Sequence, residues 1–162
     1  MIDSPIHIRL QQEHFESEVQ QAMLSILVSA DFIKRKQLAV CGLKNLTHSQ
    51  YNILRILKGK PAGYCRKEII ERMVEKAPDV TRLIDGLVSE KLAERVSSET
   101  DKRMSLTRIT EKGINLLSEL HEPMQLLAQE MNEIFSKHDL HVITELCGRI
   151  ITHEMKAEGE QS

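Results

Sequence analysis

The apolar residues near the start of the chain recur at steps of three and four. This spacing runs from Phe15 to Ile33 and is the pattern of a long amphipathic helix. Gly42 is expected to end this helix, because glycine is favoured just past a helix C-terminus. The first structural element that the sequence predicts is therefore a long helix with one apolar face.

A second helix has both of its boundaries marked in the sequence. Thr47 and Gln50 have the T-x-x-Q spacing of a capping box, and Leu46 and Tyr51 occupy the two positions of a hydrophobic staple. Three residues that interrupt helices follow, namely Gly59, Pro61 and Gly63. We expect a helix from about Thr47 to Lys58.

Two short helices are expected next. Cys65, Ile69, Ile70, Met73 and Val74 form the apolar face of the first, and Ala77 is expected to end it. The next helix is expected to begin with Pro78 in its first position and Asp79 in its first turn. Its inward residues are expected to be Val80, Leu83, Ile84, Leu87 and Val88, and its outward residues Asp79, Thr81, Arg82, Asp85, Gly86 and Ser89.

A β-hairpin and two further helices complete the predicted elements. Short strands are expected around residues 93–96 and 104–109, joined by the polar tip SSETDKR. Thr110 is expected to cap a long helix that carries an apolar stripe and is kinked at Pro123. A last helix is expected from about Asp139 to Met155, followed by a disordered tail, AEGEQS. Such stripes usually pack inside one chain, but stripes at both ends favour dimerisation.

The composition is that of a globular protein, with 41% hydrophobic and 28% charged residues in a chain of 162. The net charge is −2, but it is unevenly distributed. Between Arg55 and Lys112 there are 14 basic and 10 acidic residues, against 8 and 14 in the rest of the chain. An anionic partner is therefore expected to bind the middle of the chain. No apolar run is long enough to cross a bilayer, and a cytoplasmic location is expected.

Two short helices followed by a hairpin are typical of a winged helix-turn-helix. The segment VTRLIDGLVSEKLAERVSSETDKRMSLTRITEKG, from Val80 to Gly113, resembles the recognition helix and wing of the MarR (multiple-antibiotic-resistance regulator) family. The family pattern reads roughly V-T-R-L-hydrophobic-x-x-L, then G-L-V-x-R, D-x-R and L-T-x-x-G. Each string alone is weak evidence, and their order and spacing carry the resemblance.

The resemblance implies a mainly α fold with a small β-wing and long N- and C-terminal dimerisation helices. Residues 1–162 would form a single MarR-like chain, with a winged-helix DNA-binding lobe at 45–112 and a dimerisation region at 8–40 and 113–156. It also implies a homodimer that binds a pseudo-palindromic operator in double-stranded DNA and represses nearby genes. Many members bind a small aromatic or phenolic ligand between the dimer helices and the lobe. No cofactor is expected.

The resemblance places nine residues at the DNA. Arg82 is the best candidate for reading guanine, because its planar guanidinium spans two acceptors. At the wing tip, the family's arginine probes the minor groove, which makes Arg103 its counterpart, and Asp101 would orient Arg103 or Lys102. Arg66 and Lys67 are positioned for phosphate contacts. The full set is Arg66, Lys67, Pro78, Asp79, Thr81, Arg82, Asp101, Lys102 and Arg103.

Two residues depart from the family pattern on this surface. Lys91 stands where the family usually has the glycine that ends the recognition helix, and a left-handed conformation there would be strained. Gly86 replaces a residue that is commonly basic. The DNA face is therefore expected to be less positive than is typical.

Other functions receive weaker support. Cys65 precedes Arg66 and Lys67 and could be an oxidant-sensing thiol, but a small half-buried residue is the preferred interpretation. Three cysteines, Cys41, Cys65 and Cys147, are expected to be free thiols, and the histidines around His138 favour no metal site. No catalytic motif is present, so an enzyme is not expected. The main alternative to a DNA-binding regulator is a winged-helix module that binds a protein.

Overall fold

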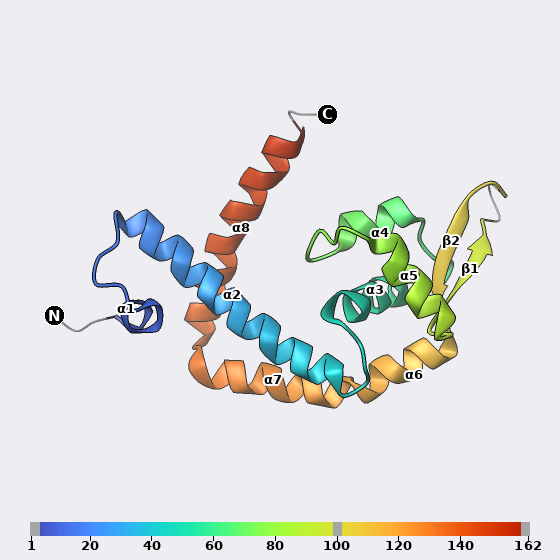
Figure 1. Ribbon diagram of the computed structural model, residues 1–162, viewed down its shortest axis with the longest axis horizontal. Helices are drawn as coiled ribbons and strands as arrows, with labels where there is room; N and C mark the ends of the chain where they lie inside the picture. Colours follow the sequence, from blue (N-terminus) through green and yellow to red (C-terminus); the bar gives the residue numbers. More distant parts are fainter. Residues whose placement is uncertain (1–3, 99–101, 160–162) are drawn as a thin grey trace. The chain divides into compact units, whose positions relative to one another are not determined.

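The computed structural model describes residues 4–98 and 102–159. The chain divides into two compact units, Met1–Glu122 and Pro123–Ser162. The first unit contains helices α1 (Pro5–Leu10), α2 (Glu18–Gly42), α3 (His48–Lys58), α4 (Arg66–Arg72), α5 (Val80–Ser89) and α6 (Glu111–Glu119), with strands β1 (Ala93–Ser97) and β2 (Ser105–Ile109) (Figure 1). Helix α7 (His121–Ile134) begins at the end of this unit, and α8 (Lys137–Gly159) follows it in the second. Within the described ranges, no helix is long and apolar enough to span a membrane.

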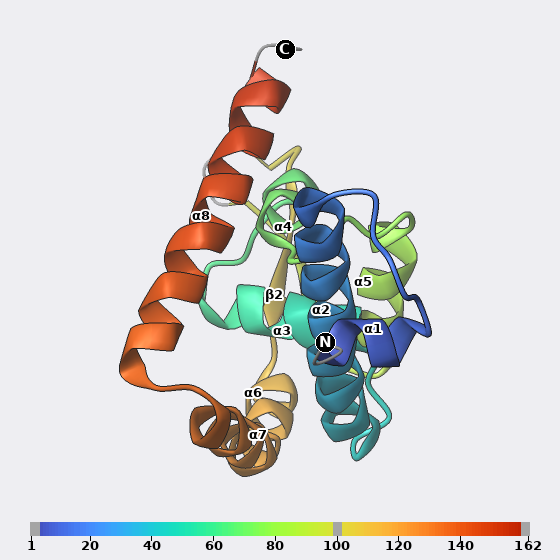
Figure 2. The same ribbon diagram turned by 90° about the vertical axis from the view of Figure 1, so that its left-hand side faces the viewer.

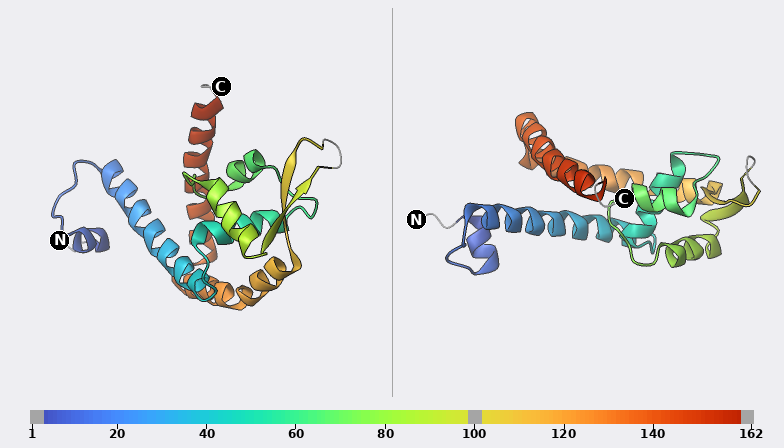
Figure 3. Two further views of the ribbon diagram at one scale, coloured as in Figure 1. Left: turned by 45° about the vertical axis from the view of Figure 1, so that its right-hand side comes forward. Right: turned by 90° about the horizontal axis from the view of Figure 1, so that it is seen from above.

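The fold is a mainly helical winged helix, as the sequence predicts. Helices α3, α4 and α5 lie together, and the antiparallel pair β1–β2 extends beyond them as the wing (Figures 1 and 3). The strands pair from Ala93 opposite Ile109 to Ser97 opposite Ser105. Tyr64, just before α4, exchanges two backbone hydrogen bonds with Thr107 of β2, at 2.9 and 2.8 Å. The wing is thereby joined to the loop that leads into α4.

The core of the lobe lies on α3. Ile53, Leu54 and Leu57 are fully buried there, together with Ile69 of α4 and Leu87 of α5. Burying a side chain of this size contributes roughly 1.5–3 kcal/mol, so this cluster is the main source of stability for the lobe. Of the inward face predicted for α5, Val80, Ile84 and Leu87 are buried on this core, and Leu83 and Val88 are half-buried.

The predicted helix starts are confirmed at α3 and nearly so at α2. In α3, the backbone N–H of Gln50 donates to Thr47 Oγ1 at 3.1 Å, and the backbone N–H of Thr47 donates to Gln50 Oε1 at 3.0 Å, which is the reciprocal capping box. Helix α2 begins at Glu18 rather than at Phe15, because Ser17 caps it. Phe15 instead stacks against His7 of α1, with ring centroids 4.6 Å apart, and α1 lies against α2 (Figure 2).

The predicted start of α5 is wrong by two residues. Pro78 lies in the turn before the helix and not in its first position, and Asp79 is the N-cap rather than a first-turn residue. Its side chain accepts a hydrogen bond from the backbone N–H of Arg82 at 3.0 Å. A short acceptor side chain is most favourable at the N-cap, and this preference sets the start of the helix.

The predicted end of α4 is also wrong. The helix stops at Arg72, and the segment up to Ala77 is not helical. Met73 has an extended backbone, and Val74, assigned to the apolar face, is 76% exposed. Two contacts hold this segment, a hydrogen bond from Val74 N–H to Asn52 Oδ1 at 3.0 Å and an ion pair between Glu75 and Lys34 at 2.9 Å. These contacts replace the helical hydrogen bonds that the sequence pattern predicted.

The helices after the wing are confirmed with shifted boundaries. Thr110 caps α6, as expected. The long helix then breaks at Leu120, three residues before Pro123, where the missing N–H and the ring of proline prevent a regular helical turn. Helix α8 reaches Gly159, so residues 157–159 of the tail that was expected to be disordered are helical.

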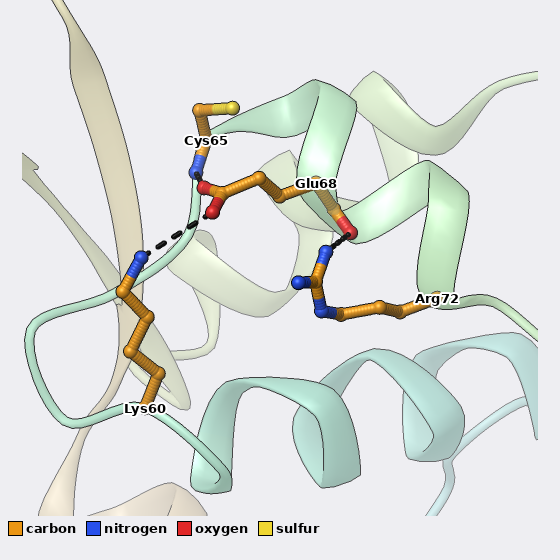
Figure 4. A network of polar contacts seen from close by, with 4 residues as sticks. All are labelled: Lys60, Cys65, Glu68 and Arg72. Atoms are coloured by element: carbon orange, nitrogen blue, oxygen red, sulfur yellow. Dashed lines mark hydrogen bonds and ion pairs between the residues drawn. The ribbon is translucent and has the colours of Figure 1, made fainter.

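A small network of polar contacts fixes the start of α4 (Figure 4). The Glu68 carboxylate accepts hydrogen bonds from Cys65 N–H at 2.8 Å and from Lys60 Nζ at 3.3 Å, while Arg72 donates to the Glu68 carbonyl oxygen at 2.9 Å. The hydrogen bond from the Cys65 backbone holds the pKa of the Glu68 carboxyl below its ordinary value, against the smaller effect of burial, with further help from Lys60. Lys60 and Arg72 also lie 4.9 and 4.8 Å from the centre of the Tyr64 ring.

Lys91, the second residue beyond α5, has the left-handed backbone that the sequence analysis identified as a source of strain. Lys91 has φ of 61°, in the region that glycine adopts without cost. Its N–H donates to the Val88 carbonyl at 2.9 Å, and Leu92 N–H donates to Leu87 at the same distance. These hydrogen bonds satisfy carbonyl groups at the C-terminus of α5 and direct the chain into β1. They hold Lys91 in its strained conformation.

The lowered pKa of Glu68 predicts a specific dependence of stability on pH. A carboxyl whose folded-state pKa is lowered stabilises the fold above its unfolded-state pKa, about 4.3, and this contribution is lost as the pH falls through the folded-state pKa. Glu68→Gln keeps an acceptor for Cys65 but does not titrate. Its free energy of unfolding, measured in urea between about pH 5 and about pH 3, should therefore fall less than that of the parent. Glu71→Gln on the same helix is the control, and a parent-like slope for Glu68→Gln would contradict the assignment.

The strained backbone at Lys91 predicts a stabilising substitution. Lys91→Gly should raise the free energy of unfolding by about 1 kcal/mol, because glycine adopts the left-handed conformation without steric cost. The matched control is Glu90→Gly at the preceding residue, whose φ of −82° gives glycine no advantage, and this variant should be less stable than the parent. Equal effects of the two substitutions in chemical denaturation would contradict the prediction.

Candidate nucleic-acid interface

The outward face of α5 is polar because its opposite face is buried. Val80, Ile84 and Leu87 are at most 5% exposed. Successive residues of a helix point about 100° apart, so this burial directs Thr81 and Arg82 away from the core. Thr81 and Arg82 are both exposed, in the first turn of the helix, as the sequence predicts.

Arg82 borders an open cavity of about 790 Å³. The cavity is walled by the outward face of α5, by residues 77–79 and by Thr47, Ser49 and Gln50 at the start of α3. Among the residues that the structure describes, no ion-pair partner is present for the Arg82 guanidinium. A side chain in this state retains its charge and all its side-chain donors for a ligand.

The predicted phosphate contacts lie beside this surface. Arg66 is the first residue of α4 and donates from Nη1 to Thr81 Oγ1 of α5 at 3.2 Å. The structure therefore brings together two predicted site residues that are 15 positions apart in the sequence. The Lys67 side chain is 86% exposed and lies 3.9 Å from Glu71, a distance that leaves it largely solvated.

The wing tip is described in part. Lys102 and Arg103 are exposed in the turn that leads into β2. Asp101, which was expected to orient them, lies outside the described residues, so its role stays a prediction.

Two ion pairs on the lobe were not found from the sequence. Asp85, on the outward face of α5, pairs with Arg95 of β1, and Glu94 pairs with Arg108 across the hairpin at 2.7 Å. The partners are 10 and 14 residues apart, so no local pattern predicts them. Asp85 lies close to Arg82 on the helix, but its charge is compensated by Arg95.

The cysteines are free thiols, as expected. Burial raises the pKa of the Cys41 thiol, outweighing a backbone hydrogen bond, so this thiol stays protonated. Cys65 and Cys147 are half-buried, and Cys65 uses its backbone N–H to bind Glu68. In the described part of the chain, no three His, Cys, Asp or Glu side chains are grouped so as to hold a metal ion.

A transcriptional regulator is similar to this chain in sequence. The HTH-type transcriptional regulator MhqR of Bacillus subtilis is 27% identical over 105 residues, which cover 65% of this chain and 72% of that protein. No protein-family model matches the chain.

Solved structures share the fold over most of its length. A MarR transcription factor from Planctomyces limnophilus is 29% identical, with a TM-score of 0.62 over 83% of this chain and 98% of that one. A mutant of MarR from E. coli, solved with operator DNA, has a TM-score of 0.74 at 20% identity over 85% and 99% of the two chains. PcaV from Streptomyces coelicolor, solved with its natural ligand, has a TM-score of 0.64 at 20% identity over 76% and 89%. In its winged helix, in the motifs of α5 and the wing, and over most of its length, the chain is therefore similar to transcriptional regulators of the MarR type.

Proposed function

We propose that this chain is a sequence-specific DNA-binding transcriptional regulator that acts as a homodimer on a pseudo-palindromic operator. The observation that carries the proposal is the outward face of α5, where Arg82 has no ion-pair partner within the described part of the chain and is aimed by the burial of the opposite face. The MarR mutant of E. coli with the same fold was solved with operator DNA. Helix α5 would enter the major groove, as the second helix of such a pair does.

Each predicted site residue that the structure describes has a role in this proposal. Arg82 reads a base edge with its guanidinium, and Thr81 contacts the DNA beside it. Arg66 and Lys67 contact phosphates, and Lys102 and Arg103 follow the minor groove at the wing tip. Pro78 and Asp79 set the start of α5 and through it the direction of Arg82.

Dimerisation is supported by apolar side chains that stay exposed on the end helices. On α2, Val19, Met23 and Leu27 are about 60–70% exposed, and on α8, Leu146, Ile150 and Ile151 are about half exposed. Rows of this kind on a soluble chain mark an interaction surface. Residues 8–40 and 113–156 would form the dimer interface, and residues 45–112 the DNA-binding lobe.

The regulator is proposed to be a repressor that a small aromatic or phenolic ligand releases from DNA. PcaV, which has the same fold, was solved with its natural ligand. A ligand between the dimer helices and the lobe would change the spacing of the two recognition helices, which must match half-sites one helical turn apart. As a DNA-binding regulator, the protein is proposed to act without catalysis and in the cytoplasm.

Arg82 and Arg103 should differ in what they read. Arg82→Ala should lose discrimination by roughly 1–3 kcal/mol at one base position of each half-site, because it removes a directed contact to a base edge. Arg103→Ala should weaken binding to most sequences alike and reduce the salt dependence by about one unit of slope per lobe.

The measurement is a set of binding isotherms on an operator selected from random DNA and on its single-base variants, at several salt concentrations. Arg149→Ala, an exposed arginine of α8, is the control. If both variants bind every sequence as tightly as the parent, the winged helix is instead a module that binds a protein.

The exposed apolar residues of α8 predict that a single charged substitution among them will dissociate the dimer. Ile150→Lys should give monomers in sedimentation velocity at micromolar concentration, because a buried unpaired ammonium disfavours the interface. Thr152→Lys, an exposed residue of the same helix, is the matched control and should stay dimeric. A parent that sediments as a monomer would overturn the assignment of the interface.

A further inference from the structure

We propose that Gln50, at the start of α3, is a further DNA contact whose side-chain amide nitrogen donates to a phosphate oxygen beside the recognition helix. The inference rests on the proposed function and extends the interface from α5 and the wing to a third element. Neither the sequence patterns nor the family motifs point to this residue.

The capping box fixes the orientation of the Gln50 amide. Its Oε1 atom accepts hydrogen bonds from the backbone N–H of Thr47 at 3.0 Å and from Thr47 Oγ1 at 3.1 Å. A backbone N–H is a donor only, so the amide atom that faces it must be the oxygen. The NH₂ group is therefore turned away from Thr47 and carries two donors that are unused within the described residues.

The donors are directed toward the outward face of α5. A Cβ atom built on Gly86 would lie 3.4 Å from Gln50 Nε2, so the amide nitrogen lies directly over this glycine. Gly86 is one helical turn beyond Arg82, and all three residues line the same cavity. Any larger side chain at position 86 would cover the amide, and glycine leaves it open to the cavity.

The chemistry of this cavity edge fits a phosphate. The amide offers donors and Arg82 offers a guanidinium. Of the two nearby carboxylates, Asp85 is paired with Arg95, and Asp79 accepts a hydrogen bond from the Arg82 backbone. A helix is about 10–12 Å wide and the major groove about 12 Å wide, so a helix in the groove lies between two phosphate strands. The edge of α5 that adjoins α3 meets one of these strands, where Gln50 lies as an anchored donor.

A donor whose own position is fixed can also fix the position of the protein on the DNA. Because the capping box already orders the Gln50 side chain, binding costs little further conformational entropy. Phosphate contacts fix the register and orientation of a protein on the duplex. Gln50 would therefore set how deeply α5 enters the groove and so align Arg82 with its base.

Gln50→Glu is the most direct test. Glutamate at this position preserves the capping box, so the melting temperature should stay close to that of the parent. It replaces the donor that faces the phosphate with a charged oxygen. Operator affinity should fall roughly 10–100-fold, alike for all single-base variants and more at low salt than at high salt.

Gln20→Glu is the matched control. Gln20 is also the third residue of a capped helix, α2, and its Oε1 likewise accepts a backbone N–H, from Glu16 at 2.7 Å. This variant adds the same charge outside the lobe. Sedimentation velocity checks that it is still a dimer, and as a dimer it should bind DNA as the parent does.

Gly86→Ala tests the same contact without changing Gln50. The added methyl group is in ordinary contact distance of Nε2 and favours the helix, so the variant should fold. It should weaken binding by covering the amide. The Gln50→Glu and Gly86→Ala effects should then be less than additive in the double variant, since both remove one contact.

Phosphate ethylation interference decides the assignment. The parent should show one interfering phosphate per half-site that Gln50→Glu no longer shows. Parent-like affinity of Gln50→Glu, with Arg82→Ala impaired, overturns the role of Gln50 and leaves the proposed function intact. A loss confined to one base position overturns the phosphate assignment. A parent that selects no DNA overturns both.

Discussion

Burial of one face of α5 is the constraint on which the DNA-facing surface depends. Val80, Ile84 and Leu87 are buried at 5% exposure or less, and the core of α3 lies beneath them. The helical repeat converts this burial into a direction for every other side chain of α5. Arg82 needs no contact of its own to point outward, and this leaves its guanidinium available for a ligand.

The base of the wing is attached to the core beneath α5. Thr110 N–H donates to the Leu92 carbonyl at 3.1 Å, and Gly113 lies so close that an added Cβ would overlap this oxygen. Thr107, one of the few buried polar residues, pairs with Tyr64 before α4. The start of α4, the end of α5 and the wing are thus tied together near one point. The base of the wing is therefore fixed relative to α5.

The sequence predicted those features whose cause is local. The capping box of Thr47 and Gln50, the apolar face of α5 and the hairpin depend on residues close together in the chain, and all are present. The predicted start of α5 was wrong because proline at the first helical position and aspartate at the N-cap are both favourable. The hydrogen bond from the Arg82 backbone to Asp79 decides in favour of the N-cap.

Features with distant causes were not predicted. The end of α4 depends on Asn52 and Lys34, which are far from Val74 and Glu75 in the sequence. The pairing of Asp85 with Arg95 likewise has no local signal. The sequence predicted Gln50 only as a capping residue, because its amide lies beside Gly86 only once α5 has folded against α3.

The chain has a net charge of −2, so its proposed binding to DNA depends on how the charges of the lobe are paired. Arg95 and Arg108 are each paired with a carboxylate, so they add little to the field at long range. In the proposed complex, this pairing would weaken the attraction of the lobe to the phosphate backbone and with it the non-specific affinity. In the proposed complex, the directional contacts would come from the Arg82 guanidinium and the Gln50 amide, beside those of Arg66, Lys67, Lys102 and Arg103. Such contacts form only when α5 is correctly positioned in the groove. A lobe with little surplus charge would therefore discriminate better between the operator and other DNA, and its total affinity would be lower.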